Sequence, residues 1–332
     1  MRRREFIALL GGATTFPVAV LAQKPGAPVI GYLGAGSPSG LGELLTAFRS
    51  GLTEMGYTEG QNVRIEYRFA EGQYSKLPTL AAELVQLQLT AIVTTGGTRV
   101  ALAAKAARAA KAATDKIPII FSAGDDPVES GVISSLNRPG GNVTGATFIT
   151  NVLEAKRLEL LHELLPNVGV IALLVNPSNP TVKDQVQQTQ NAADRLGIKL
   201  IVLNAANADE IDASFMAMLQ KGAGAVLVAS DAFFFSRRKQ LIVLAARYAV
   251  PAIYQLREFT TDGGLMSYGT SVTEAYHQVG IYTGRVLNGE KPADLPVIQP
   301  SKFQLVINLR TAKALGVTVS NSMQLLADEV IE

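Results

Sequence analysis

Apolar residues along this chain alternate between short continuous runs and sets spaced three or four positions apart. The runs predict buried strands, and the spaced sets predict helices that bury one face. Regular alternation of the two is typical of a parallel sheet with helices on both faces. In the first part of the chain the pattern predicts strands at 29–33, 63–68, 91–94 and 117–121, and helices at 41–55, 77–87 and 99–113.

A second series of the same kind follows, so we expect two α/β lobes of about 130 residues each. The turn-forming segment 138–142 between them is short, which indicates that the lobes are close neighbours. This series predicts strands at 170–175, 200–203, 225–229 and 252–254, and helices at 154–165, 182–196, 211–220 and 237–248. Beyond them we expect a long helix at 273–287, a proline-rich connection, a strand at 303–308 and a helix at 309–315.

Residues 1–22 have the three parts of a secretory signal: a cationic start, a short apolar stretch, and small residues just before Gln23. The pattern Arg3-Arg4-x-Phe6-Ile7 is similar to a twin-arginine export signal. We therefore expect cleavage near Ala22 and a periplasmic protein. The alternative is an uncleaved amphipathic N-terminal helix. After residue 22 no apolar run approaches the length of about 18 residues that a membrane span needs.

Composition narrows the classes of protein further. The 332 residues are 48% hydrophobic and 17% charged, which supports a sizeable core and argues against intrinsic disorder. The absence of cysteine excludes disulfides, thiolate metal sites and cysteine nucleophiles, and also a lipid anchor on cysteine. With two histidines, the chain has no means of building a histidine-rich metal cluster.

The charge of the chain is concentrated at its start. The formal net charge is +2, and residues 1–22 contain three arginines and one glutamate. Removing them from 30 basic and 28 acidic residues leaves 27 of each sign, so the expected mature chain is neutral. This balance gives no reason to expect a nucleic acid or an anionic membrane surface as a partner.

Candidate ligand contacts come from loops at the carboxyl ends of the strands, where open parallel sheets bind small molecules. The loop containing Thr95, Gly96, Gly97 and Thr98 is the most informative, because its glycines expose backbone just before a helix begins. That arrangement suits a carboxylate or phosphate-like group at the helix N-terminus. An ordinary helix cap with turn glycines is the alternative. Ser37 lies in the glycine-rich loop after the first strand and is a further candidate.

Acidic and aromatic residues at other strand ends have two interpretations each. Asp126, next to Asp125, is either half of a metal-binding carboxylate pair or a helix cap. Asp231, after Ser230, either pairs with a ligand ammonium or caps a helix. Tyr254 and Tyr268 lie near predicted loops, where they either line a cleft or pack in the core.

Enzyme motifs are missing from the loops. The first loop has Gly40 one position too late for the dinucleotide pattern G-x-G-x-x-G, and neither a P-loop nor a G-x-S-x-G motif occurs. His162 and His277 both fall within predicted helices, distant from the strand ends. We find no acid–base constellation, and predict no catalytic residue, no cofactor and no metal site.

Several segments together carry a resemblance to a known family, and they run through nearly the whole chain after residue 22. They are GDDPV at 124–128, LNRPGGNVTG at 136–145, EAKRLELL at 154–161, LVNP at 174–177, SDAFFFSRR at 230–238, GGLMSYG at 263–269, GEKPADLP at 289–296, KFQLVINL at 302–309 and TAKALG at 311–316. With them the chain resembles the ABC-transporter substrate-binding proteins of the tryptophan/tyrosine-uptake type, which have the type I periplasmic binding fold.

The resemblance implies two doubly wound parallel-sheet lobes, joined by crossing hinge strands, that close on a ligand. It implies residues 28–147 with about 263–300 in the first lobe, and 148–262 with about 301–332 in the second. Amino-acid-binding members hold the ligand carboxylate at the loop matching Thr95–Thr98, and the ammonium near groups matching Asp126, Ser230 and Asp231. Here Ala232 and three phenylalanines follow Asp231 where relatives often have a polar residue, so another aromatic or carboxylate-bearing ligand stays open.

We therefore expect a non-enzymatic, monomeric periplasmic receptor that captures a small organic ligand, an amino acid or an aromatic or carboxylate compound, and delivers it to an ABC permease. One alternative is a periplasmic α/β enzyme acting on a small organic acid. The other is a ligand sensor for a membrane signalling protein.

Overall fold

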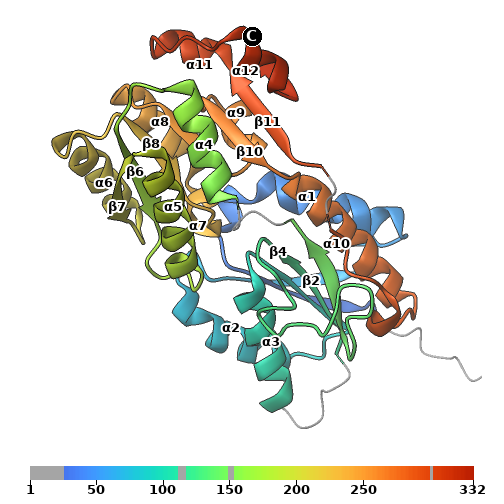
Figure 1. Cartoon of the computed structure of the whole chain (residues 1–332). Helices are drawn as coiled ribbons and strands as arrows, with labels where there is room; N and C mark the ends of the chain where they lie inside the picture. The colour runs from blue at the N-terminus through green and yellow to red at the C-terminus, as the bar shows by residue number, and fades with distance from the viewer. Residues whose placement is uncertain (1–25, 111–116, 149–152, 300–301) are drawn as a thin grey trace, which may run out of the picture.

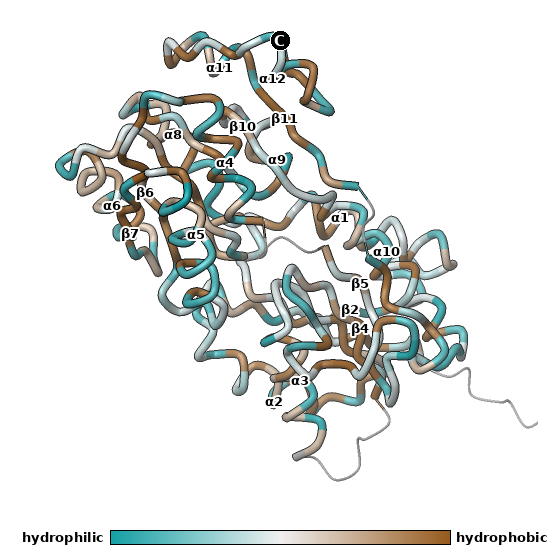
Figure 2. Tube along the Cα trace, in the orientation of Figure 1, coloured by the Kyte–Doolittle hydropathy of each residue, from teal (hydrophilic) through white to brown (hydrophobic). Residues whose placement is uncertain are grey.

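The computed structural model describes residues 26–110, 117–148, 153–299 and 302–332, which form two α/β lobes side by side (Figure 1). The export signal predicted at 1–22, with cleavage near Ala22, lies outside the described residues, as do the last positions of the helix predicted at 99–113. Hydrophobic residues concentrate along the strands and on the helix faces that cover them (Figure 2).

The first lobe is built on a parallel five-stranded sheet with strand order β2-β1-β3-β4-β5. The apolar residues of its two faces belong to separate clusters, one shared with α1 and α10 and the other with α2 and α3. The strands are β1 (Val29–Gly34), β2 (Arg64–Phe69), β3 (Ala91–Thr95), β4 (Ile119–Ala123) and β5 (Val143–Thr147). The helices are α1 (Gly42–Glu54), α2 (Leu77–Gln86), α3 (Thr98–Ala110) and α10 (Val272–Leu287).

The second lobe has a seven-stranded sheet with order β12-β11-β10-β9-β8-β6-β7, in which β10 and β11 are antiparallel. Its strands are β6 (Val170–Val175), β7 (Lys199–Asn204), β8 (Ala225–Val228), β9 (Ala252–Tyr254), β10 (Met266–Gly269), β11 (Gln304–Asn308) and β12 (Glu329–Ile331). Its helices are α4 (Glu154–Leu164), α5 (Val182–Leu196), α6 (Ala208–Gln220), α7 (Ala232–Ser236), α8 (Arg238–Arg247), α9 (Arg257–Thr261), α11 (Leu309–Ala314) and α12 (Asn321–Leu326).

The predicted α/β class with two lobes of mainly parallel sheet is confirmed. The sequence pattern missed short elements of mixed composition: β5, β10, α9, α12 and β12. In β5 the Val-Thr-Gly-Ala-Thr sequence has one aliphatic residue larger than alanine, so it contains no apolar run from which a strand could be predicted. Its Gly145 is required by packing, because a Cβ there would lie 2.0 Å from the Phe121 carbonyl oxygen.

The segment 263–300, which we expected in the first lobe, is divided between the lobes. Helix α10 packs on α1, but β10 pairs with β9 and β11 in the seven-stranded sheet. Only four residues separate α9 from β10, and so short a connection keeps β10 beside the strand it follows. The expectation is therefore wrong for β10.

The lobes also meet directly at α7. A Cβ on Gly40 of the first lobe would lie 2.3 Å from the Ser236 Cα, so only glycine permits this approach. Arg238 donates from Nη1 to the Gly40 carbonyl at 2.8 Å and lies 3.5 Å from Glu43. The Thr270 hydroxyl, just after β10, donates to the carbonyl of Phe148, just after β5. Within the described residues, no helix is both long enough and apolar enough to cross a membrane.

Candidate ligand-binding site

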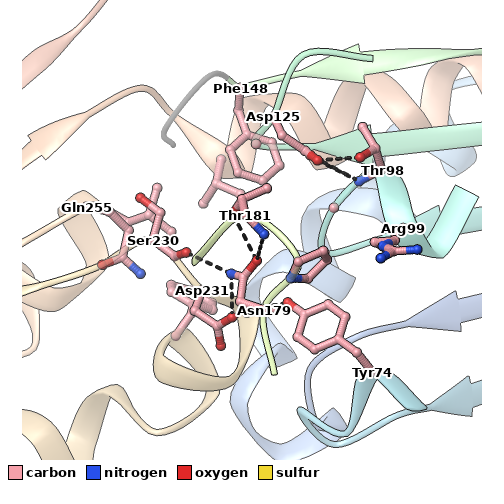
Figure 3. Close-up of a pocket in the computed structure, with 18 of the residues that line it drawn as sticks. Tyr74, Thr98, Arg99, Asp125, Phe148, Asn179, Thr181, Ser230, Asp231 and Gln255 are labelled. Atoms are coloured by element: carbon pink, nitrogen blue, oxygen red, sulfur yellow. Dashed lines mark hydrogen bonds between the residues drawn. The ribbon is translucent and has the colours of Figure 1, made fainter. Parts of the chain in front are cut away.

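A cavity with a volume of about 640 Å³, open mouth included, lies between the lobes (Figure 3). We call it the interlobe cavity. The first lobe, with α10, lines it with Leu41, Leu44, Tyr74, Gly96, Gly97, Thr98, Arg99, Gly124, Asp125, Phe148, Val272 and Tyr276. The second lobe lines it with Asn179, Pro180, Thr181, Ser230, Asp231, Ala232, Phe235, Gln255 and Leu256.

On the first-lobe side, Asp125 occupies the N-terminus of α3. Its Oδ1 accepts from the Thr98 backbone N–H at 3.0 Å, and its Oδ2 accepts from the Thr98 hydroxyl. The helix dipole and these donors favour a carboxylate there, while burial raises the pKa of Asp125 above its ordinary value. Both donors come from one residue, so the carboxylate keeps lone pairs for a further donor.

On the second-lobe side, Asp231 is held by four donors. Its Oδ1 accepts from Asn176 Nδ2 at 3.2 Å and from the Phe233 N–H at 2.8 Å. Its Oδ2 accepts from Asn179 Nδ2 at 2.7 Å and from the Tyr74 hydroxyl at 3.2 Å. A carboxylate has about four lone-pair sites, so the acceptor capacity of Asp231 is used up by the protein itself. Burial raises its pKa.

The loop after β6 orients the two asparagine side chains that donate to Asp231. Asn179 Oδ1 accepts from both the backbone and the hydroxyl of Thr181, which orients its amide nitrogen toward Asp231. Asn176 Oδ1 accepts from the Ser178 N–H, which orients its own amide nitrogen in the same way. The contact from Tyr74 is the one that crosses between lobes.

Ser230 is fixed from beneath by a buried ion pair. Glu154 and Arg157 lie 3.3 Å apart with both side chains fully buried. Glu154 accepts from the Ser230 N–H, and Arg157 donates to the Ser230 hydroxyl at 3.0 Å. Arg157 also donates to the Tyr268 carbonyl at 2.8 Å, which ties this strand end to β10. These contacts hold Ser230 in a defined position beside the pair, while the second Glu154 oxygen, Oε2, is buried without a hydrogen-bond partner.

The rest of the wall is apolar. The aliphatic and aromatic surface comes from Leu41, just before α1, from Leu44 of α1, and from Phe235, Leu256 and Val272. Tyr276 adds its ring, while its hydroxyl bonds to Thr95 and Tyr32 inside the first lobe, and burial raises its pKa to about 12. The interlobe cavity is therefore lined by charged and amide groups together with a hydrocarbon surface.

The structure brings five of the predicted site residues into the cavity wall: Gly96, Gly97, Thr98, Ser230 and Asp231. Gly96 has a φ of 93° and Gly97 a φ of 119°, backbone conformations that favour glycine. The position expected for a ligand carboxylate at Thr98 is filled by Asp125.

The other five predicted residues lie outside the cavity lining. Thr95 is buried with its hydroxyl 3.0 Å from that of Tyr32. Asp126 accepts from the N–H groups of Val128 and Glu129, so it caps a turn at 127–131 and not the helix expected there. Tyr254 stacks on Phe259 and Tyr268 on Phe303, with ring centroids 4.5 Å and 6.1 Å apart. Ser37 pairs with Ser39 on the surface.

Sequence reasoning missed Tyr74, Arg99, Asp125, Asn179, Thr181 and Gln255. Two of them, Asp125 and Gln255, are immediate neighbours of the predicted residues Asp126 and Tyr254. Asn179 and Thr181 follow the strand predicted at 170–175, so the rule that ligands bind at strand ends could have found them. Arg99 and Tyr74 likewise follow strands β3 and β2 by only a few positions.

Metal binding finds no support in the part of the chain that the structure describes, where no group of three or more His, Asp or Glu side chains is placed to hold an ion. His162 lies on α4 and His277 on α10, where its Nε2 is 2.7 Å from Glu54.

Comparison with known proteins gives one family match. The family model described as ABC transporter substrate binding protein matches residues 37–331. A curated relative, the tyrosine-binding protein of Clostridioides difficile, is 27% identical over 268 residues, which cover 81% of this chain and 75% of the relative.

Solved structures of similar chains agree in fold. A Streptococcus pneumoniae ABC domain in complex with L-Trp is 28% identical, with a TM-score of 0.77 and coverage of 92% of this chain and 99% of that one. A conserved domain protein from Vibrio cholerae is 26% identical, with a TM-score of 0.78 and the same coverage.

Proposed function

Because the chain belongs to the family of ABC transporter substrate-binding proteins, we propose that its ligand is an α-amino acid with an apolar or aromatic side chain. Family membership itself makes the protein the solute-binding component that serves an ABC permease, and not an enzyme, so that prediction from the sequence is confirmed. The proposal concerns the class of ligand and the way in which the interlobe cavity holds it.

One observation carries the proposal: the interlobe cavity offers both charged groups and a hydrocarbon surface, as an amino acid has both a charged head group and a side chain. Asp125 keeps acceptor capacity, so the ligand ammonium faces Asp125. Arg99, the one cationic side chain among the described lining residues, faces the ligand carboxylate. The ligand side chain then lies against Leu41, Leu44, Phe235, Leu256, Val272 and Tyr276.

The proposed placement changes the roles expected from the sequence. The ammonium contact moves from Asp126 and Asp231 to Asp125, because Asp231 is already saturated by four donors. The carboxylate contact moves outward from Thr98 to Arg99, because Asp125 occupies the Thr98 donors. A Cβ on Gly97 would lie 3.8 Å from Asp125 Oδ1, so the glycine leaves that side of the carboxylate uncovered.

The relatives support an amino-acid ligand. The curated relative is named for binding tyrosine, and the pneumococcal structure holds L-Trp. Both ligands have the zwitterionic head group and large side chain that this cavity would separate.

Binding would favour the closed arrangement, because only there do residues of both lobes contact one ligand. The Tyr74 hydroxyl on Asp231 and Arg238 on the Gly40 carbonyl are contacts that the two lobes make with each other. The two lobes, with α10 on the first and β10 on the second, would move as separate bodies.

We propose in addition that the protein is exported to the periplasm by the twin-arginine route, is cleaved near Ala22 and acts as a monomer. The twin arginines and the small residues before Gln23 support the route and the cleavage. The neutral charge after residue 22 supports the absence of nucleic acid among its partners.

A thermal-shift screen with L-amino acids and with their amine-free analogues tests the ligand class. A ligand present at a hundred times its Kd adds about 2.7 kcal/mol of stability, an easily measured rise in Tm. We expect apolar and aromatic L-amino acids to raise Tm and the amine-free analogues not to. If no amino acid raises Tm, or if the analogues act equally well, the proposal is wrong.

A further inference from the structure

Gln255 is a polar residue of the interlobe cavity that the proposed ligand head group does not contact. Its side chain is only 2% exposed, and its Oε1 is buried without a hydrogen-bond partner. Among the described residues that line the cavity, no other has a buried side-chain N or O atom without a partner. A buried amide without partners is costly, and a ligand that supplies one recovers that cost.

Local structure explains why the amide faces the cavity. Gln255 directly follows β9, and successive residues of an extended chain point to opposite sides. Tyr254 points into the second-lobe core, where it stacks on Phe259 at 4.5 Å, so Gln255 points the other way. The backbone there has no freedom to turn, because the Gln255 carbonyl is packed against Gly269, where a Cβ would lie 2.0 Å from the oxygen.

The place of Gln255 in the cavity indicates which part of the ligand it meets. In Figure 3 it lies beside Ser230, across the cavity from Thr98 and Arg99, where the proposed head group binds. Leu256, its neighbour in the chain, belongs to the apolar wall. The amide is therefore a polar spot on the side of the cavity that receives the ligand side chain.

We propose that Gln255 is a specificity-determining residue: its carboxamide hydrogen-bonds a hydroxyl or N–H on the ligand side chain and so favours, among the large side chains that the cavity accepts, those that carry such a group. This inference rests on the proposed function, since it assumes an amino acid with its head group at Asp125 and Arg99. Tyr276, the other lining residue with a polar group beside the hydrocarbon wall, does not compete for this role, because its hydroxyl is engaged by Thr95 and Tyr32.

The preference between ligands arises from two effects: the hydrogen bond that a polar side chain makes with Gln255, and the cost of leaving the Gln255 amide without a partner when an apolar side chain binds. A bound ligand whose side chain has no polar group would cover the Gln255 amide. The amide would then have neither water nor a protein group as a hydrogen-bond partner. Sites built to hydrogen-bond a substrate group reject analogues that lack it for this reason. For one neutral buried hydrogen bond, the expected preference is roughly 10- to 100-fold in Kd.

Calorimetric titration with L-tyrosine and L-phenylalanine, which differ by one hydroxyl, tests the inference. The wild-type protein should bind tyrosine at least about tenfold more tightly. In Gln255→Met, of similar length but apolar, the ratio should fall toward one, with weaker binding of tyrosine and equal or tighter binding of phenylalanine. Gln240→Met is the matched control, since Gln240 is in the same lobe with its amide engaged by Ala208 and Asp212; it should keep the wild-type ratio.

The outcomes separate this inference from the proposed function. If both amino acids bind wild type equally, or if Gln255→Met keeps the wild-type ratio, Gln255 does not determine specificity and the amino-acid proposal stands. If neither they nor any other amino acid bind, the proposed function and this inference fail together. The wild-type ratio needs no variant, so it can contradict the inference even if Gln255→Met does not fold.

Discussion

Two carboxylates line the interlobe cavity, one from each lobe, and their surroundings differ. Asp125 of the first lobe has two donors, both from Thr98, while Asp231 of the second lobe has four donors from four residues. Both are partly or wholly desolvated, and burial raises the pKa of each. Charge and burial alone would assign both to the ligand, but the remaining hydrogen-bonding capacity assigns them different tasks.

The difference extends to the two sides of the cavity. On the second-lobe side, Ser230, Asn179 and Asp231 bond to one another and to the buried Glu154–Arg157 pair. Within that network the acceptor capacity of Asp231 is filled without a ligand. On the first-lobe side, Asp125 and Arg99 leave room for charged partners. In the proposed placement, the second lobe therefore supplies a fixed surface and the first lobe supplies the charged contacts.

The largest effect is expected from replacing Asp231, which should lower the stability of the protein. Asp231→Asn puts an amide NH₂ among four donors, and buried donors without acceptors each cost about 1–3 kcal/mol. We expect the free energy of unfolding to fall by about 3 kcal/mol in urea titrations. A loss below about 0.5 kcal/mol would contradict the view that Asp231 is a structural centre.

Replacing Asp125 should act on the ligand more than on stability. Asp125→Asn keeps an acceptor for Thr98 but removes the charge that faces the ligand ammonium. Charged hydrogen bonds contribute about 1.5–3 kcal/mol, so amino-acid affinity should fall about 30-fold while Tm changes little. Calorimetry and thermal melts of the same samples measure both. An affinity equal to that of wild type would mean that the ammonium lies elsewhere.

Acidification should reproduce the Asp125 effect in the wild-type protein. Burial raises the pKa of Asp125, so as pH falls this group takes up a proton before an exposed aspartate does, and the contact with the ammonium is lost. We expect affinity to be constant above the raised pKa and to weaken below it, by at most about tenfold per pH unit from this group.

Asp231 titrates in the same direction, so the variant is the control. Asp125→Asn should bind weakly at every pH and show a shallower slope on acidification than wild type. Equal slopes in the two proteins would assign the dependence to another group.

The smallest effect is expected at the contact between the lobes. Tyr74→Phe removes the hydroxyl that reaches Asp231 across the cavity and keeps the ring. A net hydrogen bond contributes about 1 kcal/mol, so the closed form and the ligand affinity should weaken about threefold to fivefold. Small-angle scattering would report the shift toward the open form. A loss of about 30-fold, the size expected of a charged contact, would mean that Tyr74 contacts the ligand head group itself.

Much of this arrangement could be predicted from the sequence. The strand and helix pattern indicates two α/β lobes, and the rule that ligands bind at strand ends points to Gly96–Thr98, Ser230 and Asp231, which do line the cavity. Export near Ala22 and a monomeric state remain predictions.

The errors in the predicted site residues are mostly shifts by one position. The sequence points to Asp126 and Tyr254, whereas their neighbours Asp125 and Gln255 line the cavity. One residue of difference reverses the side to which a side chain points, and the end of a short strand such as Ala252–Tyr254 gives too few residues to set that alternation from sequence. The capacity of Asp231 could not be predicted either, because its donors Tyr74 and Asn176 are distant in the chain.

The central claim is that the ligand ammonium pairs with Asp125 and not with Asp231. A thermodynamic cycle tests it most directly: Kd values for tyrosine and for its amine-free analogue are measured on wild type, Asp125→Asn and Asp231→Asn. Removing the amine should cost wild type and Asp231→Asn a similar factor, and should cost Asp125→Asn at least about tenfold less. If the amine instead loses its value in Asp231→Asn and keeps it in Asp125→Asn, the assignment is contradicted.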